Sequence, residues 1–297
     1  MKLLRVGEKG NEKPAILDSN NVIRDLSSNI KDFNSDNLKL EIITKLKNIN
    51  LEKLPIIKNS ERIGSCVSKP GKFVAIGLNY SDHAKETGAK SPTEPIVFMK
   101  ATSSITGPND DIEIPKDSSK LDWEVELAIV IGKEAKNITE KEAPNHILGY
   151  CIVNDVSERE WQLEKLGQWV KGKSGDTFGP TGPYLVTQDE IPDINNLNLI
   201  LEVNEKKMQS GNTKNMIFNV NFLVSYLSKF MSLQPGDIVT TGTPAGVGMG
   251  MKPPVFLKPE DKIKLSIDNL GEQNSEVTTR GVSPHVWVDG LSITGEA

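Results

Sequence analysis

Short apolar runs, separated by turn residues, recur along most of the chain, whereas long helical patterns are few. Strand-like runs occupy residues 73–76, 95–98, 127–131, 149–153, 182–186, 237–240 and 262–267. Apolar residues recur at helical spacing over two long segments, 158–166 and 218–231. Many strands with few helices predict a mainly β fold with some α-helix, rather than a doubly wound α/β sheet.

The first 70 residues differ from the rest in the pattern of their strand-like segments and turns. Strand-like segments at 3–6, 14–17 and 22–26 alternate there with turn residues, and apolar residues at helical spacing follow at 37–47. The sequence Lys69-Pro70-Gly71 makes a natural break. We therefore expect a small N-terminal α+β domain at 1–70 and a larger domain at 71–297.

The composition excludes several classes of protein. The 297 residues include 35 Lys and Arg against 40 Asp and Glu, and this net charge of −5 argues against non-specific nucleic-acid binding. No apolar run reaches the roughly 18 residues of a membrane-spanning helix, and the first residues turn polar before a signal-peptide core forms. Two distant cysteines, Cys66 and Cys151, make no disulfide framework. We expect a cytoplasmic protein that binds neither nucleic acid nor membrane.

The segment from Asp122 to Ile131 carries the first candidate chemistry. Alternate residues of a strand share a face, so Glu124 and Glu126 point the same way and the apolar residues form the opposite face. Two carboxylates roughly 7 Å apart repel each other unless something such as a cation compensates them. The alternative is a solvated polar face on an edge strand, which the pair alone does not exclude.

A third carboxylate follows a buried strand. The apolar run 149–153 leads to Asp155, and Ser157 opens an S-x-x-E capping box for the next helix, which leaves Asp155 free for another task. Together with the two strand glutamates it would make an all-oxygen triad. Such ligands suit a hard cation, Mg²⁺ first, then Mn²⁺ or Ca²⁺.

A polar segment holds one of the three histidines. In a helical turn His83 and Glu86 share a face, so the carboxylate can orient and charge-stabilise the imidazole. This is the arrangement of a general base with a supporting carboxylate. A histidine on a polar turn is more commonly just exposed.

The helix predicted after Ser157 presents Arg159 and Gln162 on one face, because they lie three residues apart. The guanidinium fork suits a substrate carboxylate. The favoured alternative from the residues alone is a surface salt bridge with Glu158 or Glu160.

The chain contains two glycine-containing motifs of the kind found in nucleotide-binding loops. Residues 167–174 match the P-loop pattern G-x-x-x-x-G-K-[ST], but a helix precedes them and the Gly/Pro-rich segment 175–183 that follows cannot be a helix, so we reject the match. Lys173 is then either a cation near an oxyanion or an ordinary exposed lysine. The loop 240–250 lacks a dinucleotide fingerprint; it either brings amides and a threonine hydroxyl to a ligand or is a tight connection.

An ordered set of motifs covers about two-thirds of the chain. The motifs are Gly77-Leu78-Asn79-Tyr80 with His83 and Glu86, Pro95-Ile96-Val97-Phe98-Met99-Lys100, Trp123-Glu124-Val125-Glu126-Leu127, Asn154-Asp155-Val156-Ser157-Glu158-Arg159, Gly172-Lys173-Ser174, Pro235-Gly236-Asp237 and Thr241-Gly242-Thr243-Pro244. In this order they resemble the fumarylacetoacetate hydrolase family. Asp176-Thr177-Phe178-Gly179-Pro180 and Ser210-Gly211-Asn212-Thr213 are most similar to its 2,4-dioxo-3-deoxy sugar-acid hydrolase and ureidoglycolate lyase branch.

The resemblance implies a mixed β-sandwich roll, usually a homodimer, with a Mg²⁺ or Mn²⁺ site in the larger domain. By motif position it makes Glu124, Glu126 and Asp155 the metal ligands, and His83 with Glu86 a catalytic dyad. It places Arg159, Gln162, Lys173 and Thr243 at substrate-contacting positions. The chain departs from the family pattern at Glu158, where relatives often have Ala, and at Gly175, where Phe is commoner.

Three hypotheses follow. The first is a metal-dependent hydrolase that cleaves a C–C bond in a 2,4-dioxo acid, either an acylpyruvate or a 2,4-dioxo-3-deoxy sugar acid. His83 would activate water, and the cation with Lys173 would stabilise the departing enolate. The second is a ureidoglycolate lyase, or an oxaloacetate tautomerase or decarboxylase, on the same site. The third is a non-catalytic metabolite-binding protein, which would have lost a ligand carboxylate or the dyad; this chain has lost neither.

Overall fold

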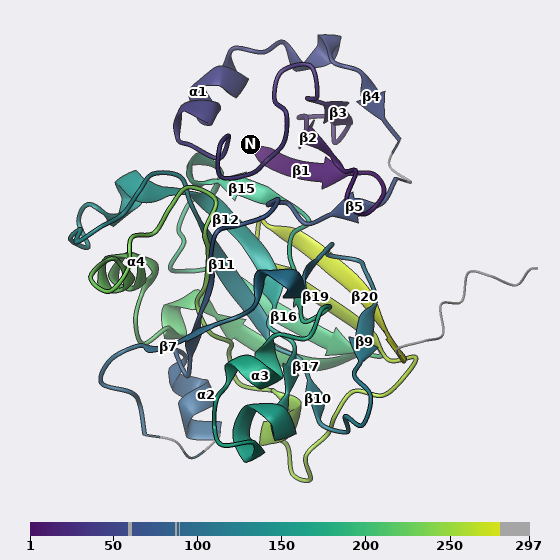
Figure 1. Cartoon of the computed structure of the whole chain (residues 1–297), viewed down its shortest axis with the longest axis vertical. Coiled ribbons are helices and arrows are strands. Elements are labelled where there is room, and N and C mark those ends of the chain that lie inside the picture. Colours follow the sequence, from purple (N-terminus) through teal and green to yellow (C-terminus); the bar gives the residue numbers. More distant parts are fainter. Residues whose placement is uncertain (59–60, 87, 89, 280–297) are drawn as a thin grey trace, which may run out of the picture.

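A computed structural model describes residues 1–58, 61–86, 88 and 90–279 (Figure 1). The end of the predicted larger domain, 280–297, lies outside the described residues. The larger of the two main sheets has eleven strands in the order β4-β3-β2-β1-β15-β12-β11-β18-β6-β7, and β5 pairs with β1. The strands are β1 (Lys2–Val6), β2 (Lys13–Leu17), β3 (Ile23–Asp25), β4 (Ile56–Ile57), β5 (Ile63–Gly64), β6 (Phe73–Gly77), β7 (Ile96–Met99), β11 (Val125–Ile131), β12 (Ile147–Asn154), β15 (Leu185–Thr187) and β18 (Ile238–Thr240).

A second sheet packs against the first. Its five strands, in the order β17-β16-β19-β20-β9, are β9 (Ile112–Ile114), β16 (Asn198–Val203), β17 (Lys206–Asn212), β19 (Lys262–Ile267) and β20 (Gly271–Thr279). Two small ladders pair β10 (Leu121–Asp122) with β13 (Ser157–Glu158), and β8 (Ile105–Thr106) with β14 (Gly179–Pro180). The predicted mainly β fold is confirmed.

Helices are short in the described part of the chain. The α-helices are α1 (Glu41–Lys47), α2 (Ser81–Glu86), α3 (Val170–Lys173) and α4 (Val220–Ser228), and one π-helix spans Glu160–Glu164. Short 3₁₀ turns lie at Leu51–Lys53, Thr102–Ser104, Ala143–His146, Gln188–Glu190, Thr213–Asn215 and Gly248–Gly250. None of the described helices is long and apolar enough to cross a membrane.

The predicted helix at 158–166 is wrong in its first turn. Ser157 and Glu158 form β13, whose ladder sets Glu158 opposite Leu121. The Ser157 hydroxyl donates to the carbonyl oxygen of Asp155 instead of capping a helix. The Glu158 side chain accepts the amide of Trp161, the second residue of the π-helix. The capping-box prediction fails because strand pairing with a distant segment holds these residues extended.

β11 lies in the middle of the larger sheet, antiparallel to both β12 and β18. Its residues Leu127 and Ile129 pack into the core between the sheets, where the second sheet contributes Leu199 and Leu265. Val130, on the alternate face, belongs to a separate core with the N-terminal segment. Both faces of this strand are therefore covered, which places its side chains in a low-dielectric environment.

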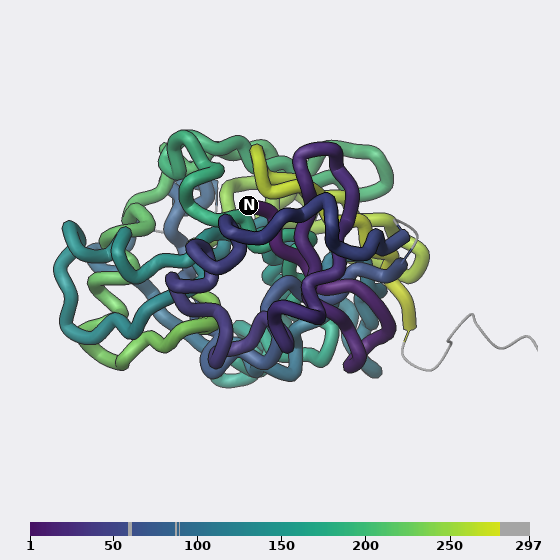
Figure 2. Tube along the Cα trace, turned by 90° about the horizontal axis from the view of Figure 1, so that it is seen from above, coloured from purple at the N-terminus to yellow at the C-terminus, as the bar shows by residue number. Residues whose placement is uncertain are grey.

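The N-terminal segment continues the larger sheet, because β1 pairs with both β2 and β15. Figure 1 shows β1–β5 and α1 together at one end of the molecule, and Figure 2, viewed from above, shows this segment lying over the rest. Its buried side chains Phe33, Leu38, Ile42 and Leu46 form the core that Val130 joins. A domain boundary at residue 70 stays a prediction.

Candidate active site

Three buried carboxylates converge where β11 and β12 meet. One ligand oxygen each from Glu124, Glu126 and Asp155 lies within 4.8 Å of the others. Strand pairing sets Val125 opposite Asn154, so the residues just outside the ladder, Glu124 and Asp155, become neighbours. The Asp155 amide donates to the Glu124 carbonyl oxygen at 2.9 Å, and the Asn154 side chain accepts the Glu124 amide. The predicted carboxylate triad is therefore assembled.

The alternative of a solvated face on an edge strand is wrong for Glu124 and Glu126. Their exposed fractions are 6% and 1%, and β11 is a central strand. Glu126 accepts the amide of Gly242 at 3.0 Å, from the glycine-rich loop that follows β18. Gly242 has a φ of 89°, a conformation that favours glycine, and this brings its amide against the carboxylate.

Two buried lysines face the triad. The Lys173 ammonium, on α3, donates to Glu124 at 2.8 Å and to Asp155 at 2.7 Å. The Lys100 ammonium, just after β7, donates to the other oxygen of Asp155 at 2.6 Å and also to the Lys173 carbonyl. Lys173 is thus a buried cation at the triad, and the alternative of an exposed lysine is wrong.

Arg159 is also part of this cluster. Its guanidinium contacts Asp122 and Glu124, with Nη2–oxygen distances of 2.8 and 2.7 Å, and donates through Nη1 to the Gln162 side chain at 2.9 Å. It makes no surface salt bridge with Glu158, whose carboxylate accepts from the backbone of Lys120 instead. Arg159 Nη2 is thus buried between these two carboxylates, which keeps the positive charge of the guanidinium beside the triad.

Burial and neighbouring charges shift the pKa values of two triad carboxylates in opposite directions. Burial, then the charges of Asp155 and Glu124, raise the pKa of Glu126 well above its usual range. Burial opposes ionisation of Glu124 too, but Lys173 and Arg159 outweigh it and hold the pKa of Glu124 far below its usual range. Of these two carboxylates, Glu126 is therefore the one whose protonated form is favoured.

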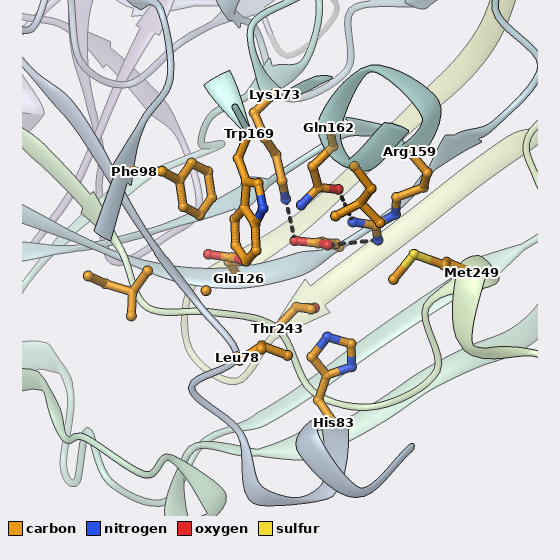
Figure 3. A pocket seen from close by; sticks show the side chains of 14 residues that line it. Leu78, His83, Phe98, Glu126, Arg159, Gln162, Trp169, Lys173, Thr243 and Met249 are labelled. Carbon is orange, nitrogen blue, oxygen red and sulfur yellow. Dashed lines mark hydrogen bonds and ion pairs between the residues drawn. The ribbon is translucent and has the colours of Figure 1, made fainter. Parts of the chain in front are cut away.

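His83 and Glu86 form the predicted pair on α2. The imidazole Nδ1 lies 3.2 Å from the Glu86 carboxylate, and His83 is only 6% exposed. The amide of Gly246 donates to both oxygens of Glu86, at 2.9 and 3.1 Å, which fixes the carboxylate behind the ring. The alternative of a merely exposed histidine is wrong. Figure 3 shows His83 on the opposite side of Glu126 from Lys173.

Thr243 supports the site from the loop after β18. Its hydroxyl donates to the carbonyl oxygen of Val125 at 2.9 Å and accepts from the Gln209 amide at 2.8 Å. These contacts tie the loop to the first residue of β11. The rejection of the P-loop match is confirmed, because a turn and not a helix follows Ser174.

These residues surround a cavity of about 170 Å³. Most predicted site residues line it: His83, Glu124, Glu126, Arg159, Gln162, Lys173 and Thr243 (Figure 3). Glu86 and Asp155 do not, and they hold lining side chains from behind. An engineered apolar cavity of roughly 150 Å³ holds a benzene molecule, so this cavity suits a small metabolite.

Two residues of the cluster, Lys100 and Asp122, were not assigned a role from the sequence. Lys100 follows an apolar strand. It is only 2% exposed and lies beside Asp155, a position that could be predicted only by knowing that β7 lies near α3. Asp122 accepts the amides of Gly248 and Met249 as well as Arg159. Its only signal in the sequence was its alternation with the two strand glutamates.

Comparison with known proteins agrees with this geometry. Residues 72–278 match the fumarylacetoacetate (FAA) hydrolase C-terminal family model, so the chain belongs to the fumarylacetoacetate hydrolase family. A Burkholderia ambifaria protein named "Putative hydrolase" is 58% identical over 274 residues, 92% of this chain and 97% of that protein. The family assignment made from the motifs is thus confirmed.

Two solved structures share the fold. Fumarylacetoacetate hydrolase from the psychrophile Exiguobacterium antarcticum is 36% identical, with a TM-score of 0.83, covering 94% of this chain and 100% of that one. Maleylpyruvate hydrolase from Sphingobium sp. SYK-6, solved with manganese(II) and pyruvate, is 27% identical, with a TM-score of 0.78, covering 94% and 99%. The family resemblance supports an enzyme.

Proposed function

We propose that this protein is a divalent-metal-dependent hydrolase that cleaves the C–C bond of a 2,4-dioxo acid of the acylpyruvate type. The observation that carries the proposal is the carboxylate triad of Glu124, Glu126 and Asp155, which faces the His83–Glu86 pair across one small cavity. The manganese and pyruvate in the related maleylpyruvate hydrolase support the same choice of cation class and product.

The triad fits a hard divalent cation such as Mg²⁺ or Mn²⁺. Its donors are all carboxylate oxygens, and because the pKa of Glu126 is raised, a cation that binds there displaces the proton of its protonated form. With that proton in place, the remaining carboxylates of the cluster are balanced by nearby cations. The balanced groups are Asp122, Glu124 and Asp155 with Lys100, Lys173 and Arg159.

Cation binding changes the charge of this cluster. Exchange of one proton for a divalent cation makes the net charge of the cluster more positive by one. That charge favours an anionic ligand in the cavity, such as a keto acid with one carboxylate. When bound, the cation supplies Lewis-acid polarisation of a keto oxygen.

Arg159 and Gln162 are placed to hold the substrate. The Arg159 guanidinium is kept in position by Asp122, and its positive charge at the cavity wall suits the substrate carboxylate. Gln162 accepts from Arg159 through its oxygen, which leaves the amide nitrogen facing the cavity (Figure 3). We propose that these two residues orient the acid end of the substrate.

His83 acts as the general base in this proposal. With Nδ1 donating to Glu86, the other nitrogen, Nε2, is the proton acceptor. It takes a proton from water as the water oxygen adds to the C4 carbonyl. The C3–C4 bond then breaks, its electron pair stays on C3 as the enolate of pyruvate, and the proton taken by His83 returns to C3. The products are a carboxylic acid and pyruvate.

Lys173 stabilises the negative charge that develops in this step. Burial disfavours its ammonium form, but the charges of Asp155 and Glu124 outweigh burial and raise the pKa of Lys173. It therefore stays a cation at the cavity wall. A fixed, buried positive charge beside a developing oxyanion needs no reorganisation during the reaction.

A substrate panel tests the function. Acetylpyruvate, a 2,4-dioxo-3-deoxy sugar acid, oxaloacetate and ureidoglycolate are incubated with Mg²⁺, with Mn²⁺ and with a chelator, and products are identified by NMR. We expect pyruvate and the matching acid from 2,4-dioxo acids, and at least about a hundredfold loss of rate with the chelator. Enolisation or decarboxylation of oxaloacetate without C–C hydrolysis favours the second hypothesis. Thermal stabilisation by these ligands without any product favours a binding protein.

Cation affinity is expected to rise with pH. Because the pKa of Glu126 is raised, a cation must displace its proton at every pH below that pKa, so the dissociation constant falls as pH rises. Calorimetric titration with Mn²⁺ in two buffers of different ionisation enthalpy measures the released proton. An affinity that does not change between about pH 5 and 8 contradicts this assignment.

A further inference from the structure

Two aromatic side chains form one wall of the cavity. Phe98 comes from β7, and Trp169 immediately precedes α3. Their ring centroids lie 5.3 Å apart at an interplanar angle of 66°, an edge-to-face contact. The Lys173 ammonium lies 5.2 Å from the centre of the Phe98 ring, so this wall borders the reacting groups directly.

A glycine makes room for the tryptophan. A Cβ at Gly77, the last residue of β6, would lie 2.4 and 2.9 Å from two ring atoms of Trp169. Gly77 is not among the residues with positive φ, so its backbone accepts any residue and only the indole requires glycine. Trp169 therefore packs directly over the strand backbone at the edge of the cavity.

The rest of the lining offers little to a second polar group. Of the described lining residues, Arg159 and Lys173 already contact the carboxylates that hold them. Half of the described lining residues are apolar, and among these the indole N–H of Trp169 is the one polar side-chain group. They are Ile76, Gly77, Leu78, Phe98, Leu163, Trp169 and Met249. A second carboxylate or a polyol chain placed against this surface loses its water without gaining charged partners.

Figure 3 shows how the two surfaces are arranged. Phe98 and Trp169 lie on one side of Gln162, and Arg159 lies on the other. A substrate whose carboxylate faces Arg159 therefore extends its acyl arm toward the aromatic wall. One end of the cavity thus suits the carboxylate of the substrate, and the other end suits an apolar acyl arm.

Resting on the proposed function, we propose that the Phe98–Trp169 wall makes this enzyme select acylpyruvates with a flat, apolar acyl arm. A flat arm packs against the indole face, as aromatic pairs do. Substrates whose arm ends in a carboxylate or carries several hydroxyls are disfavoured. The wall thus decides between the acylpyruvate and sugar-acid alternatives.

The test compares kcat/KM for benzoylpyruvate, acetylpyruvate, an acylpyruvate that ends in a second carboxylate, and a 2,4-dioxo-3-deoxy sugar acid. We expect benzoylpyruvate to exceed the dicarboxylate and the sugar acid by at least about tenfold, a discrimination typical of apolar pockets. Trp169→Ala lowers the benzoylpyruvate/acetylpyruvate ratio by about tenfold, mainly through KM, and Trp169→Phe lowers it less.

Gly77→Ala provides an independent variant, because it displaces the indole without removing it. We expect it to lower the same ratio. Phe230→Ala, at an aromatic side chain that is 66% exposed and does not line the cavity, is the matched control and keeps the ratio of the unmodified protein. Thermal melting of each variant identifies loss of folding.

Binding gives a readout that is independent of turnover. Benzoylpyruvate binding to the His83→Ala protein is followed by tryptophan fluorescence, and we expect Trp169→Phe in that background to remove most of the quenching. Equal losses on both substrates in Trp169→Ala and Gly77→Ala, or a preference for the dicarboxylate or sugar acid, overturn the inference. Cleavage of none of the 2,4-dioxo acids overturns the proposed function, and the inference with it.

Discussion

Glu126→Gln is expected to lower kcat/KM for acylpyruvate cleavage by about a thousandfold at saturating Mg²⁺, without loss of the fold. The reduction corresponds to about 4 kcal/mol of lost transition-state stabilisation, within the several kcal/mol that a catalytic cation supplies. The neutral amide keeps an oxygen for the Gly242 amide but offers the cation no charge. The variant is assayed for pyruvate release, with Mn²⁺ affinity measured by calorimetry.

The same substitution separates a metal role from a structural one. A raised carboxyl pKa means that Glu126 contributes stability at low pH that is lost as pH rises, so at neutral pH without cation its ionisable group is unfavourable to folding. Gln resembles the protonated form. In the presence of a chelator the variant should therefore melt at the temperature of the unmodified protein or above it.

Glu276→Gln, at an exposed carboxylate on β20 that does not line the cavity, serves as the matched control for this experiment. We expect it to keep both turnover and cation affinity. Undiminished turnover in Glu126→Gln would end the proposal that the triad binds the catalytic cation. A collapse of the apo fold would instead show that Glu126 is needed for structure.

His83→Ala is expected to reduce hydrolysis by about a thousandfold while the enzyme still enolises its substrate. A positioned general base contributes roughly 10²–10⁴ in rate, and hydrolysis needs that base to activate water. Hydrogen at C3 of a 2,4-dioxo acid is already acidic, and Lys173 remains to stabilise the enolate. Deuterium exchange at C3, followed by NMR in deuterated water beside pyruvate release, measures the two processes on one sample.

Two further variants sharpen this prediction. Glu86→Gln keeps an acceptor for the histidine ring but removes the charge that stabilises an imidazolium, so we expect a smaller loss, about tenfold to a hundredfold. His146→Ala, at a histidine outside the cavity, should leave both rates unchanged. If exchange and hydrolysis disappear together in His83→Ala, His83 removes the C3 proton itself, and the lyase or tautomerase reading gains support.

The sequence was informative where chemistry follows from local periodicity. The alternation of side chains along β11 and the residue before it places Glu124 and Glu126 on one face, and Asp155 directly follows the end of β12. His83 and Glu86 meet because they are three residues apart in one helical turn. These relations need no knowledge of distant segments.

Four strands of the second sheet, β9, β16, β17 and β20, were not predicted. β17 and β20 contain no continuous apolar run, and the run in β16 is only three residues long, 199–201. Their partners come from other parts of the chain, and β20 even pairs in parallel with the distant β9. Half-buried strands of this kind are specified by their sheet neighbours more than by their own composition.

By itself, then, the chain determined which acidic side chains share a face, which histidine has a carboxylate one turn away, and which family's motifs occur in order. Only the tertiary structure decided that Lys100, Lys173 and Arg159 surround the carboxylates, that Ser157 lies in a ladder and not at a helix end, and that Trp169 packs over Gly77. The reason is physical. Neighbour relations within a strand or helix follow from backbone geometry, whereas contacts between distant segments depend on how the whole core packs.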